Sequence, residues 1–168
     1  MHRQSFRESL LVGVLMLMSM VALAQSQFPQ PPQIPYGMSI GTENAKAVAA
    51  AAIAEAQKNH WTMAIAIVDT GAHLVYFERM QDTQTGSVEL AIEKARTSSL
   101  FRRPSRVFED GLAAGGDNLR ILRLTGANPN AGGMPIVVNG KLIGAIGVSG
   151  GSVDQGEQVA KAGLAAAK

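Results

Sequence analysis

The sequence predicts one α/β domain, built on a single, largely antiparallel sheet of about five strands with helices packed on it. Three observations predict this fold. Two pairs of apolar, β-branched runs are each joined by a short turn, which is the pattern of a β-hairpin. Stretches of strong helix formers come before, between and after the two pairs. This order of helices and hairpins is typical of helices covering an antiparallel sheet.

The first 24 residues are predicted to be a secretory signal peptide. Arg3 and Arg7 give a basic start, residues 10–23 are apolar or small, and residues 22–24 (ALA) match a small-x-small cleavage site. The apolar run has 14 residues, whereas a membrane span needs roughly 20. We therefore expect an exported chain, periplasmic or secreted, with no membrane span after cleavage.

Residues 25–41 form a proline-rich leader, and residues 42–168 form the domain. The leader holds four prolines between residues 27 and 37 and no charge there, which predicts an extended segment that is mobile or lies across a neighbour. Residues 25–168 carry 13 Lys and Arg against 12 Asp and Glu, with no cysteine. This balance argues against nucleic acid as a partner, and the lack of cysteine excludes disulfides and thiol chemistry.

The first helix and the first hairpin follow the leader. Residues 45–59 are rich in the best helix formers, with Thr42 as a candidate N-cap. Residues 61–68 predict a buried strand, and residues 73–78 predict its partner after a turn at 69–71. Because side chains alternate along a strand, one face of the return strand should carry four side chains: His73, Val75, Phe77 and Arg79.

A helix is predicted over residues 87–101, with Ser87 as its N-cap and Pro104 beyond its end. On a helical wheel it has three stripes. A small apolar stripe suits packing on a sheet: Val88, Ala91, Ile92, Ala95 and Ser99. A charged stripe suits solvent: Glu89, Glu93 and Arg96. A mixed stripe suits a ligand pocket or a subunit contact: Leu90, Lys94, Thr97 and Phe101.

Residues 132–151 predict the second hairpin. Asn139-Gly140 lies between two apolar runs and is the dipeptide best suited to a two-residue turn with positive φ. The strands are almost free of charge, so the hairpin is expected in the middle of the sheet. Gly144 and Gly147 indicate close approach by a helix, which is the simpler interpretation, or by a ligand.

The remaining segments are connections and the closing helix. Residues 118–124 alternate Leu and Ile with Arg and fit either a strand or a helical turn. Ser152 and Gln155 have the spacing of a capping box for a last helix over residues 153–167.

Few residues offer catalytic chemistry. There is no glycine-rich phosphate loop, no H-E-x-x-H and no paired histidines at metal-ligand spacing. His73 can ligate a metal, including haem iron, or can be a half-buried strand histidine. Met134 and Tyr76 are weaker candidates for an iron ligand and fit core packing equally. Four basic residues can hold carboxylates such as haem propionates, or can be surface charges: Arg79, Lys94, Arg102 and Arg103.

Three runs together resemble one known family. They are AIVDTGAHLVYFERMQ, SVELAIEKARTSSLFRRPS and GGMPIVVNGKLIGAIGVSGGSVDQGEQVAKAGLAA, and the resemblance extends over about residues 42–166, essentially the whole mature domain. The chain is similar here to the GlcG/HbpS family, small domains of the haem-binding or haem-degrading type that are related to the C-terminal domain of PduO-type proteins. The resemblance implies a single antiparallel sheet, assembly into dimers or larger rings, and haem binding in some members.

The resemblance also directs attention to particular residues. In haem-binding relatives the helix with the K-A-x-T motif contributes to the site, which corresponds here to Lys94 and Thr97. His73 lies in the V-D-x-G-x-H motif of the family. The expected cofactor is haem, with His73 or Thr97 as the possible iron ligand. The expected haem-binding residues are Thr97, Lys94, His73, Arg79, Arg102 and Met134.

We therefore expect an exported, homo-oligomeric haem-binding protein that captures, stores or senses haem, with no catalytic residue assigned. One alternative is an enzyme acting on haem or on a small organic acid, with His73 or Asp69 as the proton carrier. The other is a non-catalytic assembly module that binds a partner protein through its leader.

Overall fold

The computed structural model describes residues 33–168. The predicted signal peptide and residues 25–32 of the leader lie outside the described residues. The elements follow in the order α2 (Thr42–Lys58), β1 (Ala64–Val68), β2 (Leu74–Arg79), α3 (Ser87–Phe101), α4 (Arg106–Ala113), the 3₁₀ helix η1 (Gly116–Arg123), β3 (Gly133–Val138), β4 (Lys141–Ser149) and α5 (Val153–Leu164). None of the helices in this part of the chain is both long enough and apolar enough to cross a membrane.

One antiparallel sheet organises these elements, with the strand order β2-β1-β4-β3. The predicted fold class is confirmed, although residues 33–168 hold four named strands and not about five. The leader supplies a short additional pairing, because Tyr36 forms a parallel bridge with Leu142 and the Gly37 N–H donates to the Leu142 carbonyl at 2.7 Å. Residues 35–40 therefore lie on the chain's own sheet, which corrects the expectation that this stretch is mobile or lies across a neighbour.

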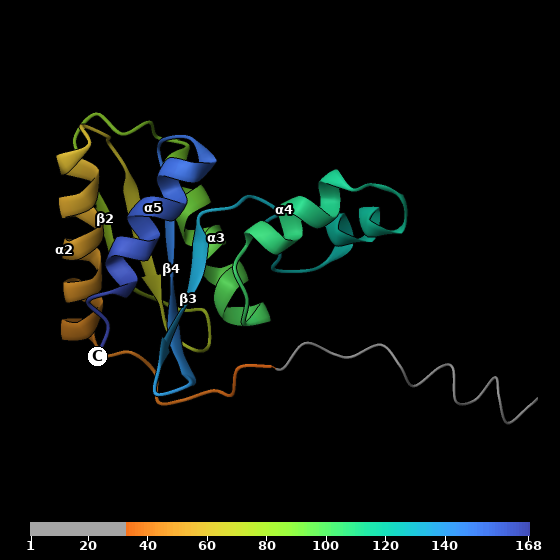
Figure 1. Cartoon of the computed structure of the whole chain (residues 1–168), viewed down its shortest axis with the longest axis horizontal. Helices are drawn as coiled ribbons and strands as arrows, with labels where there is room; N and C mark the ends of the chain where they lie inside the picture. Colours follow the sequence, from red (N-terminus) through yellow and green to blue (C-terminus); the bar gives the residue numbers. More distant parts are fainter. Residues whose placement is uncertain (1–32) are drawn as a thin grey trace, which may run out of the picture. The chain divides into compact units, whose positions relative to one another are not determined.

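Two layers of helix cover the sheet (Figure 1). Helices α2 and α5 lie side by side on one face, and α3 packs against β1, β3 and β4. The α2/α5 side holds the larger core, which includes Ile65, Ile67, Ile146 and Val159. The α3 side holds a smaller core of alanines with Val68 and Ile92. As predicted, the small apolar stripe of α3 packs on the sheet, through Ala91, Ile92 and Ala95.

The second hairpin has the predicted turn, with φ of 51° at Asn139 and 73° at Gly140. Only β4 is central, however, and β3 is an edge strand, so the expectation that both strands lie in the middle is wrong for β3. The apolar composition of β3 did not reveal its edge position, because α3 and α5 pack against β3 as they do against β4. Pro135 has no N–H to donate and fits this edge position.

The glycines of this hairpin allow the backbone of α3 to approach the sheet. A Cβ at Gly147 would meet the Ala91 carbonyl oxygen and the Ala95 nitrogen, and a Cβ at Gly133 would meet the Lys94 carbonyl oxygen. Helix packing, the simpler of the two predictions, is therefore confirmed for Gly147.

The first hairpin departs from simple alternation. Ile67 pairs with Tyr76 and Val68 pairs with Leu74, so Val75 is an extra residue at a β-bulge. Val75 packs on the larger core, whereas Phe77 packs on the smaller core on the α3 side. The prediction that Val75 and Phe77 share a face is therefore wrong, because the bulge interrupts the two-residue period.

The helix ends agree with the sequence-based predictions except at the starts of α2 and α3 and at the end of α5, which is Leu164 and not residue 167. In α5 the capping box is confirmed, because the Ser152 N–H donates to Gln155 Oε1 at 2.8 Å and the Gln155 N–H donates to Ser152 Oγ at 3.3 Å. Thr42 and Ser87 are the first residues of their helices and not the caps, since Gly41 and Gly86 precede them and no side chain caps either helix.

Residues 106–124, which we call the arm, contain α4 and η1. These two helices pack against each other, with Ile121 beside Gly111, and Figure 1 shows them projecting away from the sheet. The base of the arm is fixed to α5, because Arg106 forms ion pairs with Asp154 and Glu157 at 3.0 and 2.6 Å. The open prediction for residues 118–124 is settled as a 3₁₀ helix.

Candidate functional site

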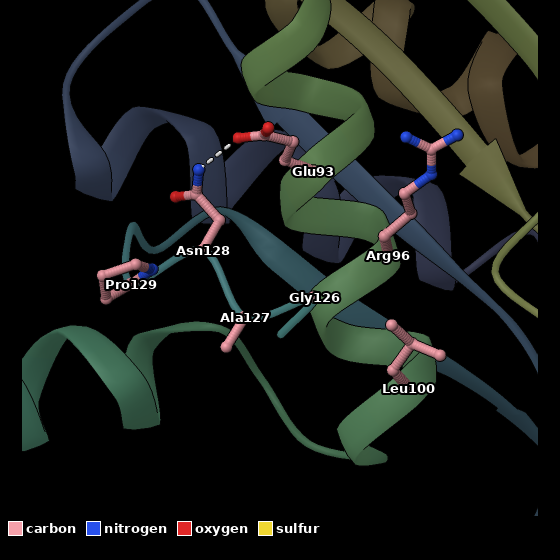
Figure 2. A pocket seen from close by; sticks show the side chains of 7 residues that line it. All are labelled: Glu93, Arg96, Leu100, Gly126, Ala127, Asn128 and Pro129. Atoms are coloured by element: carbon pink, nitrogen blue, oxygen red, sulfur yellow. Dashed lines mark hydrogen bonds between the residues drawn. The ribbon is translucent and has the colours of Figure 1, made fainter. Parts of the chain in front are cut away.

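A pocket of about 370 Å³ lies on the outer face of α3, against the loop of residues 126–129. Three residues of α3 line the pocket, and they form one stripe of the helix: Glu93, Arg96 and Leu100. In Figure 2 each of these side chains extends toward either the loop or the solvent. Ala127 and Pro129 supply apolar surface from the loop. The pocket therefore combines apolar side chains with one guanidinium and one carboxylate.

Thr97 holds the loop that forms this pocket. Its hydroxyl oxygen lies 2.8 Å from the Glu93 carbonyl oxygen and 3.3 Å from that of Gly126, and it accepts the Asn128 N–H at 2.8 Å. The Thr97 side chain is fully buried. The Asn128 amide also donates to the Glu93 carboxylate, as drawn in Figure 2. Thr97 therefore shapes the pocket from beneath and does not face it.

Arg96 connects the pocket to the turn between β1 and β2. Its Nε donates to the Ala72 carbonyl oxygen at 3.4 Å, and Ala72 is the neighbour of His73 in the chain. Among residues 33–168, Arg96 belongs to none of the ion pairs. Arg96 is one of the lining residues, and Figure 2 shows its guanidinium pointing away from the loop of residues 126–129. There it can receive a carboxylate in the bidentate geometry that arginine favours.

His73 is an exposed residue of that turn and not a half-buried strand residue, because β2 begins at Leu74 and 82% of the His73 side chain is accessible. The Asp69 carboxylate fixes the turn by accepting the Gly71 and His73 N–H groups at 2.8 and 2.9 Å. Asp69 Oδ1 also lies 3.4 Å from His73 Nδ1. This contact orients the ring so that Nε2 is the nitrogen directed away from Asp69, which is the arrangement found for metal-ligating histidines.

Lys94 is buried beside the start of β3. Its ammonium donates to the Val148 carbonyl oxygen at 3.2 Å, and a Cβ added at Gly132 would meet it. Burial lowers the pKa of the Lys94 ammonium, and the negative charge of Glu109 opposes that shift. Glu109 is itself held by the Ala131 N–H, which donates to its carboxylate at 2.5 Å. Lys94 therefore joins α3 to the sheet and lies apart from the pocket lining.

This burial leads to a pH-dependent stability. Because the folded pKa of Lys94 lies below its ordinary value of 10.5, the unfolded chain binds more protons than the folded chain between those two values. We therefore expect the free energy of unfolding of the wild type, relative to Lys94→Met, to rise as the pH increases from 7 toward 10.5. Urea unfolding at several pH values measures this difference. Lys161→Met, at an exposed position on α5, is the control and should show no such trend.

The other sequence-predicted residues lie elsewhere. Met134 belongs to the core on the α2/α5 side of the sheet, opposite α3. Arg79 is the last residue of β2, at the opposite end of the strand from the turn that holds His73. Arg102 donates to the Ile34 carbonyl oxygen at 3.2 Å and lies over the Tyr36 ring, 5.0 Å from its centre. The six predicted haem-binding residues therefore do not converge on one pocket. Thr97 contacts the loop that lines the pocket on α3, and His73 follows Ala72, which accepts a hydrogen bond from the lining residue Arg96.

Sequence reasoning missed Arg96, Leu100 and the loop of residues 126–129 as a site. The available signal was spacing, since Glu89, Glu93, Arg96 and Leu100 repeat at three or four residues and place an exposed leucine on a charged stripe. Within residues 33–168, no three His, Asp or Glu side chains gather closely enough to hold a metal ion. A haem iron differs, because one protein side chain can hold it.

The chain is similar to known proteins over most of its length. A family model described as "Haem degrading protein HbpS-like" matches residues 40–165. Protein GlcG from Escherichia coli strain K12 is 40% identical over 112 residues, which are 66% of this chain and 81% of GlcG. A crystal structure of a PduOC:heme complex matches with a TM-score of 0.69 at 27% identity, covering 77% of this chain and 95% of that one. A double mutant of HbpS from Streptomyces reticuli matches with a TM-score of 0.71 at 27% identity, covering 82% and 94%.

Proposed function

The chain belongs to the HbpS-like family, and from this premise we propose that it is an exported haem-binding protein whose site is the pocket on the outer face of α3. The solved haem complex of a similar protein supports haem as the ligand. The observation that carries the location is the pocket itself, where Arg96 lies between an apolar loop and the turn with His73. The signal-like pattern of residues 1–24 supports export.

The residues fit the three chemical parts of haem. Leu100, Ala127 and Pro129 would contact the apolar macrocycle. Arg96 would pair with a propionate, because it lines the pocket and belongs to no ion pair among the described residues. When bound, the iron supplies ligand-exchange and redox chemistry. Such a site suits haem capture, storage or sensing.

The choice between the two possible iron ligands favours His73. The Thr97 hydroxyl is fully buried and already has partners in the Glu93 carbonyl and the Asn128 N–H. The His73 ring is exposed, and Asp69 orients it through Nδ1. Neutral imidazole is also a common iron ligand, whereas a threonine hydroxyl is a weak one.

The chain would also self-associate. Its pocket is near the lower end of the 300–1,000 Å³ range of small-molecule sites, so one copy encloses only part of a tetrapyrrole. The arm carries exposed large apolar side chains, Val107, Leu119, Leu122 and Leu124. Exposed apolar groups gathered on one element mark an interaction surface.

Reversing one charge tests the location of the site. Arg96→Glu is expected to weaken haemin binding at least tenfold, because the new carboxylate repels the propionate. Arg79→Glu is the matched control, since it makes the same change at the exposed end of β2 and should leave the affinity unchanged. Both affinities are measured by Soret absorption during titration with haemin. Equal weakening by both variants, or weakening by Arg79→Glu alone, would contradict the proposed location.

A further inference from the structure

The tip of the arm presents two parallel ridges of side chains. In a 3₁₀ helix, residues three apart lie one above the other. In η1 this aligns Leu119 with Leu122, and Arg120 with Arg123. Ile121, on the third side, packs toward Gly111 of α4. Leu119 and Leu122 are 54% and 65% exposed. The leucine ridge and the arginine ridge therefore both face away from α4.

The outer face of α3 carries acidic and apolar groups at its two ends, with Arg96 between them. Glu89 and Glu93 give it an acidic end, and both are exposed. Leu100, 43% exposed, gives it an apolar end together with the loop residues Ala127 and Pro129. In the part of the chain that the structure describes, none of Glu89, Glu93, Arg120 and Arg123 belongs to an ion pair.

We propose that the arm of one copy docks on the outer face of α3 in a second copy of this chain. The leucine ridge would cover the Leu100 end of that face, and the arginine ridge would lie against Glu89 and Glu93. The arm projects away from its own sheet in Figure 1, which makes the second copy the accessible partner. Charge complementarity between the arginine ridge and Glu89 and Glu93, together with the match between the leucine ridge and Leu100, favours this occupant.

A two-fold axis would make the contact reciprocal, because each copy carries both an arm and an α3 face. Each arm would then close the open side of the other copy's pocket. This inference rests on the proposed self-association and specifies its surface. It does not depend on haem, so the experiment uses the haem-free full chain.

Sedimentation velocity over a range of concentrations tests the proposal. The wild type is expected to form dimers or larger assemblies. Leu119→Asp/Leu122→Asp is expected to raise the dissociation constant at least tenfold. Met38→Asp is the matched control, because Met38 is 88% exposed and lies outside the arm and α3. Circular dichroism melting checks that each variant is folded.

Charge reversal identifies the partner surface. Arg123→Glu and Glu89→Arg are each expected to weaken association, and the chain with both changes is expected to recover it. Recovery supports the contact between the arm and α3. A folded leucine variant that associates like the wild type would overturn the arm as the interface, while self-association would stand. A monomeric wild type would overturn both, and haem binding would still be judged by its own titration. Additive weakening in the double charge variant would overturn α3 as the partner surface.

Discussion

Replacing Gly147 by alanine is expected to lower the free energy of unfolding by about 3 kcal/mol, the upper part of the range for overpacking a core. The reason is that the added Cβ would meet two backbone atoms of α3, the Ala91 carbonyl oxygen and the Ala95 nitrogen. A side chain can rotate away, but these atoms belong to the hydrogen-bonded helix, so α3 must move from the sheet. Thermal unfolding should show a melting temperature lower by roughly 10 °C.

Gly86→Ala is the matched control for this variant. Gly86 has φ of −62° and no atom within 4 Å of an added Cβ, so alanine fits there without strain. Its melting temperature should stay within about 3 °C of the wild type, since surface changes of this kind are small. A Gly147→Ala melting temperature equal to that of Gly86→Ala would contradict the close packing of α3 on β4.

Replacing His73 by alanine is expected to remove the imidazole from the bound haem iron. The Soret maximum and the spin state of the ferric complex should change, and haemin affinity should fall at least tenfold, about 1.4 kcal/mol. The fold should be preserved, because 82% of the His73 side chain is accessible and Asp69 holds the turn through backbone N–H groups. Absorption and electron paramagnetic resonance spectra of the haem-loaded chain measure the change.

His60→Ala is the control, because His60 is the other histidine of residues 33–168 and lies at the end of α2. It should leave the spectrum of the haem complex unchanged. A His73→Ala complex with the wild-type spectrum would show that another group ligates the iron. Thr97→Ala would then be the next variant, with the expectation that it alters the loop of residues 126–129.

Local sequence patterns were sufficient for the elements that depend on a few neighbouring residues. The Asn139-Gly140 turn, the bounds of α3 and the capping box of α5 each depend on short-range chemistry. Features that depend on distant contacts were not predictable in this way. The edge position of β3, the bulge at Val75 and the pairing of residues 35–40 with β4 each depend on which segments meet in space.

The candidate site shows the same division. The helical wheel placed Lys94 and Thr97 on one mixed stripe. It could not show that Lys94 is buried against the Val148 carbonyl or that the loop of residues 126–129 covers Thr97. It assigned Glu93 and Arg96 to solvent, and both are exposed, but it could not show that they line a pocket beside the same loop. A wheel therefore identifies the residues that share a face, whereas the tertiary structure determines what lies opposite that face.

Titration of the purified wild-type chain with haemin, followed at the Soret band, tests the central claim most directly. The account predicts a saturable shift of the band with one haem per pocket. The affinity should fall at least tenfold when Arg96 is reversed in charge and should be unchanged when Arg79 is. A spectrum equal to that of free haemin at every ratio, or a linear rise without saturation, would contradict haem binding by this chain.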